Sequence, residues 1–111
     1  MIEHVNEYDF YMQYEDYFFS EAPAGVLAFV TPGSNECEVI VNKLETISEA
    51  VDIPILILDI DDIEYLAGEL DITGAPAILV YKNGIIDRRF EDDFDVGYMA
   101  DYIMEIQTNL E

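Results

Sequence analysis

The chain has 111 residues, the size of a single small domain over 1–111. Hydrophobic residues make up 51% of the sequence, which excludes a wholly disordered acidic chain. The 25 Asp and Glu residues outnumber the 4 Lys and Arg residues. The resulting net charge of −21 excludes most nucleic-acid binding and argues against docking on anionic membranes. It is compatible with basic protein partners, high solubility or imitation of a polyanion.

Cys37 is the only cysteine, so no disulfide can form within the chain. The first residues lack the positively charged start and the apolar run of a signal peptide. No apolar run approaches the ~18 residues that a membrane span needs. We therefore expect a cytoplasmic protein, and no motif indicates a bound cofactor.

Apolar periodicity and turn residues predict that strands and helices alternate along the chain. The runs 25–30 and 54–60 are almost continuously apolar, which is typical of strands buried on both faces. In chain order we expect a short edge strand over 2–5, a helix over 7–20, the strand 25–30, a helix over 35–51, the strand 54–60, a short helix bearing Ile63, Leu66 and Leu70, strands over 77–82 and 85–90, and a last helix over 95–108.

Helix starts and turns carry recognisable residues. Asn6 and Ser34 are good N-caps for the helices that follow them, and Asp61 or Asp62 is expected to cap the short helix. Asn83-Gly84 is a strong hairpin signal, so the strands on either side should pair antiparallel. The two buried strands are joined through a helix and should be parallel. The order βαβαβαββα predicts an α/β fold with one mixed central sheet and helices on both faces.

Three short motifs follow one another at informative spacings. Phe29, in a buried strand, lies five residues before Ser34-Asn35-Glu36-Cys37 at a predicted helix start. Further along, Gly74-Ala75-Pro76-Ala77 opens an apolar strand that leads to Lys82-Asn83-Gly84. In order and spacing the chain resembles the thioredoxin family, from about Ile2 to Leu110. The corresponding family motifs are Cys-Gly-Pro-Cys, Gly-Ile-Pro-Thr and Lys-Asn-Gly, so the resemblance implies a thioredoxin-like fold.

The resemblance also implies where a functional site lies. It implies a cis peptide bond before Pro76 and a groove in which the backbone of Ala75 pairs with an extended peptide. Ser34 takes the position of the attacking cysteine, Cys37 that of the resolving cysteine, and Gly33 that of an aromatic residue beside them. Cys37 and Ser34 are therefore the candidate catalytic residues. Gly33, Ala75 and Pro76 are the candidate substrate-binding residues.

The sequence departs from the family at several of these positions. The hydroxyl of Ser34 cannot form a disulfide, and Glu36 replaces the proline that tunes the redox potential. The family's buried acid and the lysine near it fall on Ala28 and Ile57. Negative charge on Glu36 and Glu38 disfavours a thiolate at the remaining cysteine. A cysteine at position 34 would restore a dithiol, but the other changes would still indicate a weak or unusual redox protein.

Each candidate also has a purely structural interpretation. Cys37 fits a small core residue on the apolar stripe of its helix. Ser34 fits an N-cap, with no His or Lys near it in the sequence to activate it. His4 fits a solvated or edge-strand side chain. The acidic runs 59–64 and 91–95 lack the ligand alternation of a calcium loop and fit capping and solvation, so no metal site is expected.

Four tyrosines, Tyr8, Tyr11, Tyr14 and Tyr17, recur every three residues. On an α-helix this spacing drifts by about 60° per step, so some of the rings should be buried in the core and others exposed. An aromatic surface rimmed by acids suits a basic protein partner, and ordinary amphipathic packing is the alternative.

Three functions are compatible with the sequence, in order of preference. The first is a thioredoxin-like protein with a degenerate redox site, in which Cys37 supports low-turnover thiol–disulfide exchange or redox homeostasis. The second is a non-catalytic binding module that recognises a basic protein or extended peptide through the groove formed by Ser34–Cys37 and the loop before Pro76, with the acidic surface selecting the partner. The third is a polyanion that imitates DNA.

Overall fold

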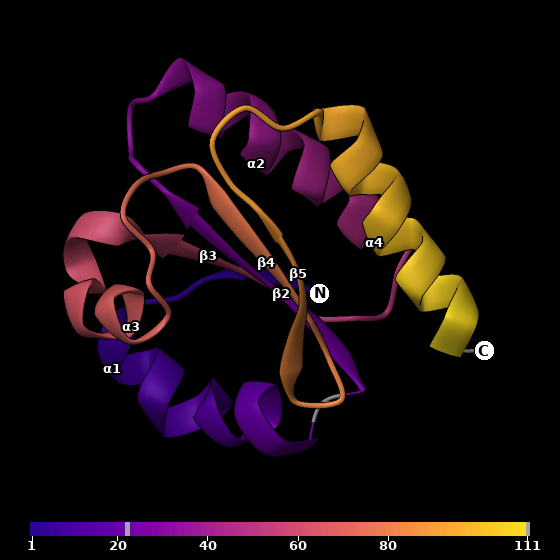
Figure 1. Ribbon diagram of the computed structural model, residues 1–111, viewed down its shortest axis with the longest axis horizontal. Helices are drawn as coiled ribbons and strands as arrows, with labels where there is room; N and C mark the ends of the chain where they lie inside the picture. The colour runs from indigo at the N-terminus through magenta and orange to yellow at the C-terminus, as the bar shows by residue number, and fades with distance from the viewer. Residues whose placement is uncertain (22, 111) are drawn as a thin grey trace.

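A five-stranded mixed sheet forms the centre of the molecule, with helices on both of its faces (Figure 1). The computed structural model describes residues 1–21 and 23–110. The mixed sheet with helices on both faces confirms the predicted α/β fold, and the elements follow one another in the predicted order. The strands lie in the order β1-β3-β2-β4-β5 and are β1 (Ile2–His4), β2 (Ala24–Val30), β3 (Ile55–Asp59), β4 (Ala77–Lys82) and β5 (Ile85–Phe90).

Parallel and antiparallel pairings meet at β2. Strand β3 runs parallel to both β1 and β2, and β4 runs antiparallel to both β2 and β5. Every residue of β2 is buried, as its apolar sequence predicts. The β4–β5 hairpin turns at Asn83 and Gly84, whose φ angles of 55° and 81° lie in the left-handed region that an Asn-Gly turn requires.

The helices divide between the two faces of the sheet (Figure 1). Residues of α2 (Asn35–Ser48) and α4 (Val96–Leu110) form one core cluster with the sheet. Residues of the N-terminal helical segment (7–21) and of α3 (Glu64–Glu69) form the other. Cys37 belongs to the first cluster. The helices are α1 (Glu7–Asp9), the π-helical turns η1 (Phe10–Tyr14) and η2 (Tyr17–Glu21), α2 (Asn35–Ser48), the short turn η3 (Ile60–Asp62), α3 (Glu64–Glu69) and α4 (Val96–Leu110).

The N-terminal helical segment differs from the regular helix expected over 7–20, because wide π-helical turns interrupt it. Phe10 and Phe18 are both fully buried in the cluster beneath this segment. Eight residues of α-helix overshoot two full turns by about 80°, and wider turns reduce that rotation. Both rings then reach the sheet, and the Phe18 ring lies so close to Gly25 that a Cβ there would come within 2.5 Å of it.

The tyrosine row also differs from expectation. Tyr8 is exposed and none of the four rings is fully buried, because Tyr11, Tyr14 and Tyr17 are half-buried and pack against the edge of the core. Their hydroxyls donate to Glu69, to Glu3 and to the carbonyl oxygen of Ala24, respectively. The hydroxyl groups are thus paired at the edge of the core rather than buried within it.

The cap of α3 is not the one predicted. Neither Asp61 nor Asp62 caps this helix. Instead, the Glu7 carboxylate accepts hydrogen bonds from the backbone N–H groups of Tyr65 and Leu66, at 3.0 and 3.2 Å. A carboxylate at a helix N-terminus is favoured by the free N–H groups and by the helix dipole. The cap therefore comes from a distant part of the chain.

Other helix boundaries agree more closely with expectation. Asn6 caps the N-terminal segment, because its Oδ1 accepts the Asp9 N–H at 2.8 Å. Helix α2 ends at Ser48 rather than 51, although Val51 remains buried. Helix α4 runs on to Leu110. Within the described residues, no helix is long and apolar enough to cross a membrane.

Candidate functional site

The loop from β2 to α2 carries Gly33 and Ser34. Gly33 has a φ of 83°, in the left-handed region, so any residue with a Cβ would strain this turn. Ser34 is the N-cap of α2: its Oγ accepts a hydrogen bond from the backbone N–H of Cys37 at 3.3 Å. This confirms the capping interpretation of Ser34.

Cys37 lies in the first turn of α2 with its thiol turned into the protein. The residue is only 2% exposed. Its Sγ accepts a hydrogen bond from the backbone N–H of Thr31 at 3.3 Å. The paired residues Ala28 and Ile57, on neighbouring strands, belong to the same core cluster. Cys37 therefore offers little surface to a reagent or a partner disulfide.

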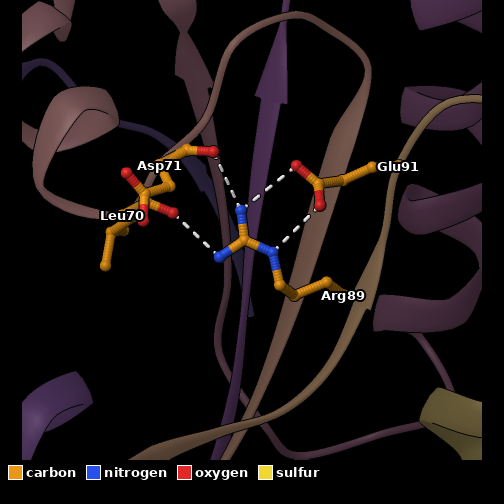
Figure 2. Close-up of polar contacts among 4 residues, drawn as sticks. All are labelled: Leu70, Asp71, Arg89 and Glu91. Carbon is orange, nitrogen blue, oxygen red and sulfur yellow. Dashed lines mark hydrogen bonds and ion pairs between the residues drawn. The ribbon is translucent and has the colours of Figure 1, made fainter.

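Arg89 on β5 holds the segment that leads from α3 to Pro76 (Figure 2). Its guanidinium donates to the carbonyl oxygens of Leu70 and Asp71 at 2.8 and 3.1 Å. It also forms a two-pronged pair with the Glu91 carboxylate, at 2.9 and 3.1 Å. Bidentate pairing of this kind fixes orientation as well as adding energy. Arg89 thus joins the start of the proline loop to the end of β5.

The electrostatics of this pair follow from its geometry. Hydrogen bonding to Arg89 lowers the pKa of Glu91 below its ordinary value. The same hydrogen bonds raise the pKa of Arg89. Both groups are therefore charged over the whole neutral range, and Glu91 is the one groove acid with a cation bound to it among the described residues.

An acidic groove runs beside the cis peptide bond that joins Ala75 to Pro76. Its volume is about 370 Å³. Three segments meet here: the first turn of α2, the loop before β4 and the loop after β5. Half of the lining residues are acids. The lining residues are Glu36, Thr73, Gly74, Ala75, Pro76, Glu91, Asp92 and Asp93.

A second hollow, also of about 370 Å³, lies at the other side of the α2 start. Its walls are mostly apolar and include Val30, Val41 and Ile57. Ser34 and Cys37 contribute to it from the helix start. The remaining lining residues are His4, Thr31, Pro32, Gly33, Glu38 and Asp59.

His4 is closer to this region than its sequence position indicated. Parallel pairing of β1 with β3 sets His4 opposite Ile57 and brings it to the rim of the hollow that contains Ser34 and Cys37. His4 is exposed, as predicted. Among the described residues no hydrogen bond joins it to Ser34 or Cys37, so the structure does not pair it with either.

The two acidic runs serve as caps. Asp59 accepts the backbone N–H of Asp61 at 2.9 Å, and Asp95 accepts that of Tyr98 at 2.9 Å. Over residues 1–21 and 23–110, no three His, Cys, Asp or Glu side chains are grouped so as to hold a metal ion.

Comparison with known proteins agrees with this architecture. The family model described as Thioredoxin matches residues 5–105, so the chain belongs to the thioredoxin family. Among curated protein sequences, none matches the chain. Solved structures nonetheless share its fold at low sequence identity.

Three of these structures are thioredoxins from three different organisms. Thioredoxin O2 from Arabidopsis thaliana, in the oxidized state, has a TM-score of 0.84 at 15% identity, covering 96% of this chain and 94% of its own. A mutant thioredoxin from Halobacterium salinarum NRC-1 has a TM-score of 0.79 at 18% sequence identity, and the match covers 96% of this chain and 90% of that thioredoxin. The reduced thioredoxin pre-protein from Schistosoma mansoni has a TM-score of 0.77 at 19% sequence identity, and the match covers 95% of this chain and 97% of that protein.

Sequence reasoning missed some contributors to this region. The sequence marks Arg89 only as one of four cations, and Asp92 and Asp93 only as capping or solvated acids. Alternation along a strand places Arg89 and Glu91 on the same side, which was a usable signal. The carbonyl oxygens of Leu70 and Asp71 gave none, because backbone partners leave no trace in the sequence.

Proposed function

We propose that this thioredoxin-family protein binds an extended, positively charged segment of a partner protein in the acidic groove, without turning over disulfides. The observation that carries the proposal is the gathering of Glu36, Glu91, Asp92 and Asp93 around the loop that contains Pro76. We place this function in the cytoplasm.

Charge complementarity supports a cationic ligand. Arg89 pairs with Glu91, and within the described part of the chain no salt bridge joins the other three groove acids to a cation. A partner's lysine or arginine side chains would speed association and select against acidic segments. The main chain of Ala75 lies at the position that, in the family, pairs with a bound peptide in the manner of an added strand.

The state of the thiol supports binding without turnover. Disulfide exchange needs an accessible thiolate and a second thiol to resolve the mixed disulfide. The sequence contains one cysteine, and Cys37 is buried. Ser34 holds the attacking position, and its Oγ caps α2.

The test is the affinity for an alternating lysine–alanine peptide, measured by fluorescence anisotropy. We expect the double variant Glu36→Gln/Asp93→Asn to bind about tenfold more weakly. The matched control is Glu45→Gln/Glu49→Gln, which removes two exposed charges at the far end of α2 and leaves the groove intact. Equal weakening by both pairs would show that only net charge matters and would refute the groove.

A bulky residue at Ala75 tests the main-chain contact separately. We expect Ala75→Tyr to lower the affinity for the lysine–alanine peptide at least as much as Glu36→Gln/Asp93→Asn does, because the tyrosine ring would fill the groove. Unchanged affinity in this variant, with the fold intact by circular dichroism, would contradict the proposed binding mode.

A second candidate function is single-thiol exchange at Cys37, favoured by the Thr31 N–H that donates to its sulfur. In this reaction the Cys37 thiolate attacks glutathione disulfide, a mixed disulfide forms, and glutathione thiolate leaves. The test is the rate of alkylation against pH, read by intact mass. Rapid alkylation of native protein near neutral pH would support exchange. Alkylation only in denaturant would exclude it.

A further inference from the structure

A patch of three exposed side chains and one half-buried ring lies where the N-terminal helical segment meets α3. Its members are Tyr8, Tyr11, Met12 and Tyr65, which we call the tyrosine patch. Tyr8, Met12 and Tyr65 are 71%, 67% and 66% exposed. Tyr8 and Met12 are four residues apart on a helical segment and are therefore neighbours on its surface. A group of large exposed apolar side chains with polar surroundings is typical of an interaction site.

The patch is held in a fixed arrangement. The Tyr11 hydroxyl donates to Glu69 Oε1 at 2.5 Å. The rings of Tyr11 and Tyr65 meet edge to face, with centroids 6.0 Å apart. Glu7, the residue before Tyr8, accepts the Tyr65 backbone N–H. These contacts tie the N-terminal segment to α3, so a ligand would meet a preorganised surface at low entropic cost.

The charges around the patch are negative. Glu7 and Glu69 contact its members directly, and Glu64 precedes Tyr65 in the sequence. The chain's cations belong to other elements and two of them are engaged there. Lys43 is on α2, Lys82 ends β4, Arg88 lies on aromatic rings, and Arg89 pairs with Glu91.

Elsewhere in this chain, aromatic rings and a carboxylate surround an arginine side chain. The Arg88 guanidinium lies 5.2, 5.1 and 5.7 Å from the ring centroids of Phe90, Tyr98 and Tyr102. The Tyr102 hydroxyl donates to Asp87. Aromatic rings and a tyrosine–carboxylate pair thus surround an arginine at this place. The tyrosine patch has the same components, with Tyr11 and Glu69 as the pair, and it carries no arginine of its own.

We propose that the tyrosine patch is a docking surface for an arginine-bearing segment of a partner protein. The guanidinium lies on the rings of Tyr8 and Tyr65, beside the carboxylates of Glu64 and Glu69. A flat, weakly hydrated guanidinium stacks on aromatic rings more readily than a lysine ammonium does, so arginine is preferred.

This surface is distinct from the acidic groove. The N-terminal segment and α3 cover the opposite face of the sheet from α2 (Figure 1). The groove is built from the start of α2 and the loops beside β4 and β5. A segment bound at the tyrosine patch would therefore leave the acidic groove open, and a segment bound in the groove would leave the patch open.

The experiment is an NMR titration of the full chain with a hexa-arginine peptide. Backbone amide signals of residues 64–69 report on the patch, and those of Ala75 and Ala77 report on the groove. We expect Tyr8→Leu/Tyr65→Leu to weaken binding at the patch about fivefold to tenfold, because both aromatic faces are lost. Binding at the groove should be unchanged. The matched control is Tyr8→Phe/Tyr65→Phe, which keeps both rings and should retain the wild-type affinity.

Both double variants leave the net charge of −21 unchanged, so a general attraction to the acidic chain cannot produce the difference. A hexa-lysine peptide should bind the patch more weakly than hexa-arginine and should not distinguish the leucine variant from the phenylalanine variant. Equal affinity of the two double variants for hexa-arginine would overturn the proposal, as would an absence of shifts at residues 64–69.

Discussion

The two hollows beside the start of α2 have the same volume, about 370 Å³, and opposite chemistry. The groove at Pro76 is lined by four carboxylates, whereas the hollow that contains Cys37 has a mostly apolar surface, to which Val30, Val41 and Ile57 contribute. In the family, the backbone of the residue before this proline pairs with a bound peptide. The contrast concentrates carboxylates beside Pro76 and leaves the surroundings of the thiol mostly apolar.

The largest effect should come from restoring a second thiol. In Ser34→Cys we expect a disulfide between positions 34 and 37 under oxidising conditions, with a loss of two hydrogens by intact mass, and insulin reduction in the presence of a dithiol reductant. The native chain should show no such activity. Adding Ala28→Asp should raise the rate further by supplying a proton acceptor beside the thiols.

This variant pair tests whether the missing carboxylate at position 28, a residue of the core cluster that contains Cys37, limits the chemistry. If Ser34→Cys/Ala28→Asp were no faster than Ser34→Cys alone, the loss of that acid would not be what limits the exchange.

The next largest effect concerns the two neighbouring arginines. Arg89→Met removes the four hydrogen bonds that hold Leu70, Asp71 and Glu91, and we expect a loss of about 2 kcal/mol in the free energy of unfolding. Arg88→Met removes ring contacts at a more exposed position and should cost about 1 kcal/mol. Urea unfolding at neutral pH measures both.

The arginine variants also separate the two surfaces. Arg89→Met should weaken peptide binding at the acidic groove, because the loop before Pro76 loses its anchor, and Arg88→Met should not. A larger loss of stability or of peptide affinity in Arg88→Met than in Arg89→Met would contradict the anchoring role assigned to Arg89.

A smaller effect is expected at alkaline pH. Hydrogen bonding to Glu3 raises the pKa of Tyr14 from 10.0 to about 12, and burial with a hydrogen bond to Asp87 raises that of Tyr102 to about 12. The unfolded chain releases these protons first, so their contribution is complete below pH 10.0 and is lost as the pH rises through about 12.

Urea unfolding across this pH range tests the assignment. The stability of the native chain should fall between pH 10.0 and about 12 more steeply than that of Tyr14→Phe/Tyr102→Phe, which lacks both phenols. Identical slopes would show that neither hydrogen bond survives in solution.

The smallest effect should be that of the thiol on peptide binding. Cys37→Ala leaves a small cavity in the core, for which we expect about 1 kcal/mol of destabilisation. It should change the affinity for the lysine–alanine peptide less than twofold, because the groove and the sulfur lie in different hollows. A large loss of affinity would link the two regions that the comparison separates.

Much of the fold was predictable because its signals are local. The apolar runs that became β2 and β3 and the Asn83-Gly84 hairpin each carry their reason within a few neighbouring residues. The same holds for the capping role of Ser34. The position of the acidic groove was also within reach, because the family motifs place the helix start and Pro76 together.

The remainder depends on contacts between distant segments. The wide turns between Phe10 and Phe18 arise because both rings must reach the sheet, and α-helical periodicity alone predicts a regular helix. The Arg89 clamp uses backbone oxygens, to which any sequence would contribute alike. His4 reaches the rim of the apolar hollow through parallel strand pairing, so its distance along the sequence was misleading.

The Glu7 carboxylate links the beginning of the chain to a helix that forms much later in the sequence. Helix α3 has six residues, too few to persist alone in water. During synthesis on a ribosome, Glu7 emerges long before α3, so the carboxylate that caps the first turn is already present when this helix forms. In the folded protein, its amide protons should exchange with solvent in step with those of the N-terminal segment. A change at residue 7 thus acts on the middle of the chain, and a truncation that removes Glu7 would be felt first at Tyr65 and Leu66.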